Sequence, residues 1–125
     1  MLIFRRKKTD KYQRAIDRRT DEALSQWVKN KRHLLEMTAS EAAEEMNLSR
    51  EQMAYYFRMY KGQDFRSWRK TMRIKEACRL IRERQDLPFS VIGEYVGISD
   101  KSNFRREFFE VCGVLPAEWK RRHCR

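Results

Sequence analysis

The sequence predicts an all-α protein of about seven helices, in which a long linker helix joins two helix-turn-helix subdomains. Only four glycines and two prolines occur in 125 residues, and residues that favour helices are abundant. The pattern of turn and apolar residues in the second half also repeats a pattern found about fifty residues earlier. The expected parts are a basic N-terminal arm or juxtamembrane segment (1–20), the first helix-turn-helix subdomain (21–63), the linker helix (64–84) and the second subdomain with a basic tail (85–125).

The N-terminal segment allows two interpretations. Its first four residues are apolar and Arg5 to Lys8 are all basic. Such a pattern is typical of a disordered basic arm, and also of the cytoplasmic end of a membrane helix. A helix is expected to start at Thr9 or Asp10 and to continue towards residue 36. We expect its apolar side chains to pack on the first motif: Leu24, Trp27, Val28, Leu34 and Leu35.

The first motif consists of a capped helix, a turn and a recognition helix. Thr38 and Glu41 have the spacing of a capping box, and Asn47 is suited to the turn because Asn tolerates positive φ. Ser49 is expected to cap the second helix, and Gly62 to end it. Its inner face is predicted to carry Met53, Phe57 and Tyr60, and its outer face the candidate DNA-binding residues Arg50, Glu51, Tyr55 and Arg58.

These outer residues suggest different contacts. Arg50 and Arg58 are suited to phosphates, and Tyr55 to a base or sugar. Glu51 is suited to accept a hydrogen bond from cytosine N4, or equally to stabilise the start of its own helix. The acidic side chains of the preceding helix, Glu41, Glu44 and Glu45, predict a face that does not lie against phosphates.

The linker helix has a length that suits two DNA contacts. A helix of about 20 residues spans roughly 30 Å, close to the 34 Å or so between successive major-groove entrances on one face of DNA. Pro88 is expected to end this element and Ser90 to cap the next helix.

The second motif repeats the first with stronger signals. Gly97 is expected to have positive φ at the turn, and Ser99 or Asp100 to cap the recognition helix. Phe104, Phe108 and Cys112 are spaced to lie on its inner face, Gly113 ends it, and Pro116 starts a last helix. The outer face carries the remaining candidate DNA-binding residues: Lys101, Ser102, Asn103, Arg105 and Arg106.

The run from about Leu34 to Arg121 resembles the DNA-binding domain of the AraC/XylS transcriptional regulators. The matching stretches are ASEAAEEMNLSREQMAYYF, VIGEYVGISDKSNFRREF and the ending from Gly113 to Trp119. The sequence departs from the family pattern at Lys61, Ile98, Phe109 and Leu115. The resemblance implies an activator that contacts RNA polymerase, and a sensor or effector-binding domain that is not part of these 125 residues.

The net charge of +11 predicts a polyanionic partner, with double-stranded DNA favoured over an anionic membrane surface. The alternative function is a helical module that docks on a protein or on acidic lipid without reading bases. Two histidines and no glycine-rich phosphate loop argue against an enzyme, and no cofactor, metal site or small-molecule site is expected. Three cysteines without metal-binding spacing favour a reducing, cytoplasmic setting, which includes the cytoplasmic part of a membrane-attached regulator.

Overall fold

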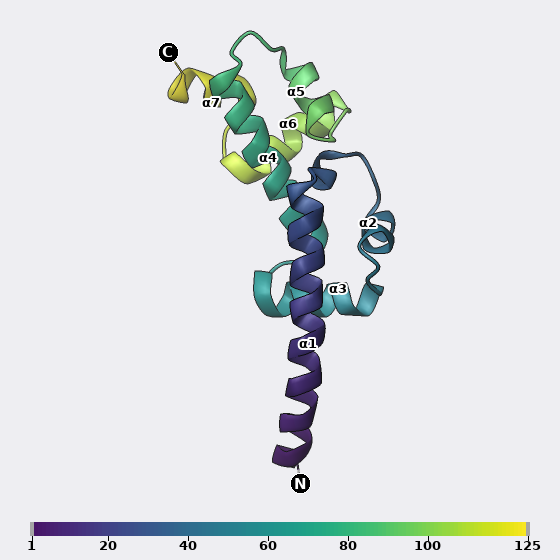
Figure 1. Ribbon diagram of the computed structural model, residues 1–125. Coiled ribbons are helices and arrows are strands. Elements are labelled where there is room, and N and C mark those ends of the chain that lie inside the picture. The colour runs from purple at the N-terminus through teal and green to yellow at the C-terminus, as the bar shows by residue number, and fades with distance from the viewer. Residues whose placement is uncertain (1, 125) are drawn as a thin grey trace. The chain divides into compact units, whose positions relative to one another are not determined.

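The computed structural model describes the backbone of residues 2–124 and the side chains of residues 11–124, and it confirms the all-α prediction (Figure 1). The chain forms two compact units, Met1–Asn30 with Thr38–Phe65 and Lys31–Met37 with Arg66–Arg125. The described residues contain no strand. Their helices are α1 (Leu2–Lys29), α2 (Ala39–Glu45), α3 (Arg50–Tyr56), α4 (Phe65–Glu83), α5 (Phe89–Tyr95), α6 (Lys101–Cys112) and α7 (Pro116–His123), with a 3-10 turn at Arg32–Leu34 and a π-helical turn at Phe57–Lys61.

Helix α1 begins earlier and ends earlier than the sequence pattern predicted. It runs without a break through Thr9 and Asp10, so neither residue caps a helix. No glycine or proline interrupts Leu2–Lys29, which explains the continuity. The helix ends before residue 36 because Lys31 has a left-handed backbone with a φ of 60°, and a 3-10 turn follows.

The core of the first unit forms around Trp27 of α1. Its ring centroid lies 5.7 Å from that of Phe65, which in turn lies 5.5 Å from Phe57 in an edge-to-face arrangement. The indole Nε1 donates a hydrogen bond of 2.9 Å to Glu45 on α2. Leu24 is buried as expected, but the prediction for Leu34 was wrong, since Leu34 lies in the core of the second unit.

The buried tyrosine of the first motif is Tyr56, the last residue of α3, whereas Tyr60 lies in the π-helical turn that follows. A π-helical turn shifts the helical register, and Tyr56 is 3% exposed whereas Tyr60 is 55% exposed. The predicted inward position of Tyr60 was therefore wrong. Both phenols donate to α1, Tyr56 to Asp21 at 2.5 Å and Tyr60 to Asp17 at 2.6 Å. Burial, reinforced by the bond to Asp21, raises the pKa of Tyr56.

The core of the second unit joins α4 to the second helix-turn-helix motif. Helix α5 begins at Phe89, directly after Pro88, so Ser90 lies inside the helix and the prediction of Ser90 as its cap was wrong. The extended backbone and fixed φ of proline explain this start. The buried residues of this core are Leu34, Ile74, Ala77, Ile81, Ile92, Val96, Ile98, Phe104 and Phe108.

A buried arginine of α4 lies beside the turn of the second motif. Arg73 is 8% exposed, and its guanidinium donates to the carbonyl oxygens of His33 at 2.8 Å and Leu35 at 2.5 Å. Burial lowers its pKa to about 10. Gly97 at the turn has a φ of +86°, and a Cβ placed there would lie 2.6 Å from the Leu34 carbonyl oxygen and 3.1 Å from the Arg73 guanidinium. The turn therefore requires glycine for both conformation and space.

Substitution at this turn should be more destabilising than substitution at an open glycine. Gly113 also has positive φ, at +76°, but nothing lies within 4 Å of a Cβ placed there. We expect Gly97→Ala to lower the free energy of unfolding by about 3 kcal/mol and Gly113→Ala by about 1 kcal/mol, because only the first adds a clash to backbone strain. Urea unfolding of both variants measures the difference. Equal losses would show that the clash with the backbone of Leu34 has no energetic weight.

His33 makes the second unit sensitive to acid. It is 7% exposed, and burial lowers its pKa from the usual 6.5, while the carboxylate of Glu76 opposes this effect and the cation of Arg73 adds to it. Because the folded pKa is the lower one, the unfolded chain binds more protons in the window below 6.5. Stability is therefore lost as the pH falls through that window.

We expect the free energy of unfolding to fall between about pH 7 and pH 5, and this slope to be shallower in His33→Gln, which cannot titrate. Urea unfolding at a series of pH values provides the measurement. His123→Gln is the matched control, since His123 is the exposed histidine of the same unit. An unchanged slope in His33→Gln would contradict the assignment.

Candidate nucleic-acid interface

The first recognition helix, α3, has a fixed start. The Ser49 hydroxyl accepts from the backbone N–H of Gln52 at 3.1 Å, and the Gln52 side chain accepts from the backbone N–H of Ser49 at 2.9 Å. These reciprocal bonds form a capping box. At the turn before it, Asn47 has a φ of 56°. The register of the outward residues of α3 is thereby set.

The candidate residues of the first motif, on α3 and on the π-helical turn that continues it, lie on a mostly exposed surface. Arg50 and Glu51 are exposed, and Arg50 donates to the hydroxyl of Ser40 at 3.1 Å. Tyr55 is half-buried, and the guanidinium of Arg58 lies 5.7 Å from the centroid of its ring. Tyr55 and Arg58 are thus brought together as an aromatic ring with a cation on its face, while Arg50 lies near the start of the helix.

The second recognition helix, α6, is capped by Asp100. The Asp100 carboxylate accepts from the backbone N–H of Asn103 at 2.8 Å. Ser99, the other expected cap, instead donates to Glu36 at 2.9 Å. The helix contains 12 residues, as many as α3 and the π-helical turn that continues it contain together, and ends at Gly113, which has a φ of 76°. The two recognition helices are therefore equal in length, and they differ in the side chains that they present.

The candidate residues of α6 lie opposite the buried Phe104 and Phe108. Lys101, Ser102, Arg105 and Arg106 are exposed, and Asn103 is half-buried. In the described part of the chain, neither Lys101 nor Arg105 forms an ion pair with a carboxylate. The helix thus has two uncompensated cations one turn apart near its start.

Sequence reasoning did not include Lys70 and Phe109 among the residues at this surface of α6. Arg106 pairs with Glu110 at 3.4 Å, and Glu110 also accepts from Lys70 of α4 at 2.9 Å. Lys70 therefore lies beside the recognition helix, although it is distant in sequence and no local pattern marks it. Phe109 is 53% exposed. Its departure from the family pattern could have identified it as an exposed apolar residue on this helix.

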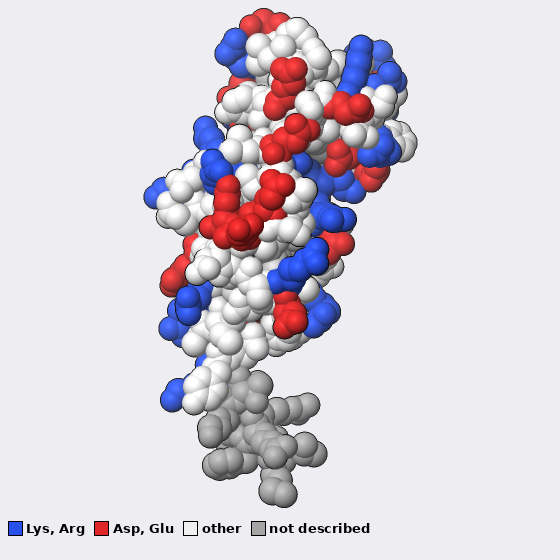
Figure 2. All heavy atoms as spheres, turned by 90° about the vertical axis from the view of Figure 1, so that its right-hand side faces the viewer, with Lys and Arg blue, Asp and Glu red and all other residues white. Residues whose placement is uncertain are grey.

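Acidic side chains mark one surface that is poorly suited to DNA. Glu41, Glu44 and Glu45 of α2 are exposed. Figure 2 looks at the side of the molecule on which α2 lies and shows a group of acidic side chains there. Like charges repel phosphates, so the candidate interface is restricted to the faces formed by α3 and α6.

The described residues offer neither a metal-binding cluster nor a membrane-spanning helix. Within residues 11–124, no three His, Cys, Asp or Glu side chains are grouped so that they could hold a metal ion. None of the described helices combines the length and apolar character that crossing a bilayer requires.

A family model described as a helix-turn-helix domain, of the AraC type, matches residues 42–122, which is more than half of the chain. The chain belongs to the AraC-type helix-turn-helix family. It is therefore a DNA-binding domain of a transcription regulator rather than an enzyme. No curated protein matches the sequence.

The AraC-type fold is also found in solved structures similar to this chain. The C-terminal domain of AraT, a response regulator from Geobacillus stearothermophilus, aligns with a TM-score of 0.74 at 24% identity, over 88% of this chain and 87% of that one. The C-terminal domain of the response regulator yesN from Fusobacterium nucleatum has a TM-score of 0.69 at 22% identity, over 81% and 98%. The DNA-binding domain of AdpA, solved with a target DNA, has a TM-score of 0.68 at 21% identity, over 82% and 90%.

Proposed function

We propose that this AraC-type domain binds double-stranded DNA in a sequence-specific manner and regulates transcription in a bacterium. The observation that carries the proposal is the face of α6, where a capped helix presents Lys101 and Arg105 without carboxylate partners, together with Ser102 and Arg106. A helix with exposed basic and hydroxyl side chains near its N-terminus is suited to enter a major groove and reach base edges.

The two recognition helices have unequal roles in this proposal. On α6, Arg105 and Arg106 are suited to bidentate contacts with guanine and Asn103 to adenine, while Lys101 and Ser102 contact phosphate or base edges. In the first motif, Arg50 on α3 and Arg58 on the π-helical turn contact phosphates, and Tyr55 contacts a base or sugar. Glu51 either accepts from cytosine or stabilises the start of its helix. Specific reading is thus assigned mainly to α6.

The regulatory setting follows from the family resemblance. Members of this family commonly activate transcription through contact with RNA polymerase and carry a separate sensor or effector-binding domain. We propose the same for this protein. DNA binding places the domain in the cytoplasm, either free or as the cytoplasmic part of a membrane-attached regulator.

Selection of bound duplexes from a random DNA pool tests the function directly. We expect one motif to be enriched, and binding to that motif to weaken by on the order of 10³-fold between about 50 and 200 mM salt, as counterions return to several phosphates. Electrophoretic mobility shifts at several salt concentrations measure this loss. Failure to enrich any motif, with retained binding to protein or anionic vesicles, would favour the interaction module instead.

Arg106→Ala is expected to weaken binding to the preferred duplex by roughly 5- to 150-fold and to relax the preference at one or two base pairs, because a bidentate base contact is worth about 1–3 kcal/mol. Titrations on the preferred duplex and on a scrambled duplex measure both effects. Arg58→Ala is expected to weaken binding to the preferred duplex and to the scrambled duplex by the same factor.

Arg122→Ala is the matched control for this pair of measurements. Arg122 is also an exposed arginine that pairs with a glutamate four residues away, Glu118 at 2.9 Å. It lies on α7, outside both recognition helices. If Arg122→Ala relaxed the base preference as much as Arg106→Ala, or if Arg58→Ala alone erased it, the assignment of reading to α6 would be wrong.

A further inference from the structure

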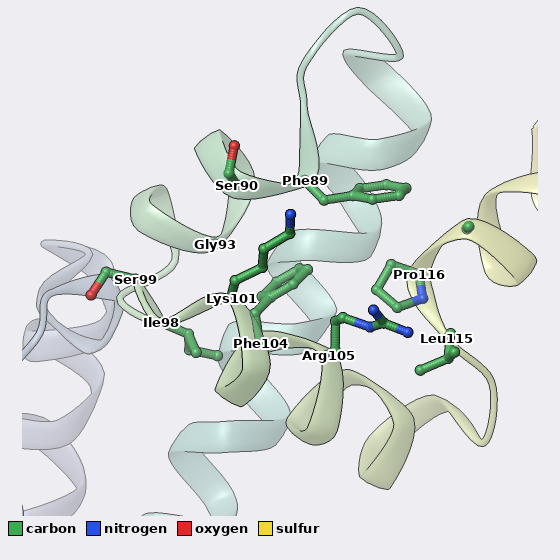
Figure 3. Close-up of a pocket in the computed structure, with 11 residues that line it drawn as sticks. Phe89, Ser90, Gly93, Ile98, Ser99, Lys101, Phe104, Arg105, Leu115 and Pro116 are labelled. Atoms are coloured by element: carbon green, nitrogen blue, oxygen red, sulfur yellow. The ribbon is translucent and has the colours of Figure 1, made fainter.

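An apolar pocket of about 270 Å³ lies inside the second unit, next to the recognition helix (Figure 3). It is lined by residues of α5, α6, the turn between them and the start of α7. Its floor is apolar, with Phe89, Ile98, Phe104, Leu115 and Pro116. The volume is near the lower end of the range of about 300–1,000 Å³ that is typical of small-molecule sites.

The charged side chains of this pocket are both basic. They belong to Lys101 and Arg105, one turn apart on α6, and no acidic residue lines the pocket. In Figure 3 the Lys101 ammonium points towards Phe89, and the Arg105 guanidinium towards Leu115 and Pro116. Ser90 and Ser99 are the other polar lining residues. The Ser99 hydroxyl donates to Glu36, and in Figure 3 both serine oxygens point away from Phe104, so the pocket combines an apolar interior with two cations.

We propose that this pocket binds an amphipathic monocarboxylate with a short apolar tail. The volume is about nine times the roughly 30 Å³ that one water molecule takes in the liquid, which leaves room for a tail the length of octanoate. The tail is buried against Phe104 and Ile98, and the carboxylate lies between Lys101 and Arg105. Burial of the tail supplies the affinity, and the paired cations select an anion over a neutral alcohol.

The ligand competes with DNA for the same side chains. Lys101 and Arg105 are among the residues assigned to the DNA interface, so this second step rests on the proposed function. A carboxylate bound between them neutralises the cations that would meet phosphate or base edges. Binding of the carboxylate and of DNA is therefore mutually antagonistic, and the coupling is reciprocal.

Direct binding is tested first, without DNA. Octanoate is titrated into the ¹⁵N-labelled full chain at constant ionic strength, and amide shifts are followed by NMR. We expect the shifts to concentrate at the pocket residues of α5, α6 and the start of α7, and 1-octanol to bind about fivefold more weakly because it lacks the ion pairs. Lys101→Gln should weaken octanoate binding and leave 1-octanol binding unchanged, because it removes one of the two cations. Equal binding of octanoate and 1-octanol would overturn the proposal, as would shifts spread over both units.

A variant that fills the pocket tests the link to DNA. Ala117 lines the pocket but is exposed and lies on α7, so Ala117→Leu adds apolar volume there at a position that is not assigned to DNA. We expect octanoate to displace DNA from the unaltered chain. In Ala117→Leu, the octanoate concentration needed for the same displacement should rise by about tenfold or more, which corresponds to about 1.4 kcal/mol of ligand binding. Ala15→Leu, at an exposed alanine of α1, is the control and should retain the effect.

The outcomes separate this inference from the proposed function. Displacement of DNA that persists in Ala117→Leu would overturn the pocket assignment, and DNA binding that is insensitive to octanoate would overturn the antagonism. If no DNA binding is seen at all, the proposed function fails, while the NMR titration still decides whether the pocket binds a carboxylate.

Discussion

The second helix-turn-helix motif depends on the buried guanidinium of Arg73. It donates to the carbonyl oxygens of His33 and Leu35, and it lies against the Gly97 turn. A buried cation is stable only when its donors are satisfied, and its lowered pKa reflects the cost of burial. Because Leu34 lies between the two carbonyls, the same interaction holds its side chain in the core under α5 and α6. The position of α6 therefore depends on a segment that is more than sixty residues earlier in sequence.

The features that were predictable from sequence are those with a local physical cause. The turns at Asn47 and Gly97 need positive φ, which few residues tolerate, and the helices that begin after Thr38, Ser49 and Asp100 have a side-chain oxygen as their cap. Two of the errors arose where the cause was not local. Leu34 continues an apolar stripe, but the left-handed Lys31 ends the helix first and directs Leu34 into the other unit. The π-helical turn likewise changes the register after Tyr56, so the regular spacing that placed Tyr60 inward does not continue to that residue.

The candidate interface was predictable as a set of side chains but not as a set of contacts. Helical periodicity is enough to place Lys101, Ser102, Arg105 and Arg106 on the outer face of α6. It could not show that Glu110 is shared by Arg106 and Lys70, since α4 and α6 meet only in the folded unit. The apolar pocket was missed for the same reason: its lining comes from α5, α6 and α7, and Leu115 and Pro116 enter it from a loop and a helix start.

The pocket also determines which arginine of α6 should be substituted to test base reading. Arginine has an apolar stem as well as a charged end, and Arg105 lines the pocket. Removing it would change the packing around Phe104 together with any contact to DNA, so a loss of binding would have two causes. Arg106 does not line the pocket, and its partner is the exposed Glu110 on the same helix. An exposed pair of this kind contributes at most about 1 kcal/mol to stability. A change in base preference at Arg106 therefore reports on DNA contact rather than on the fold of the recognition helix.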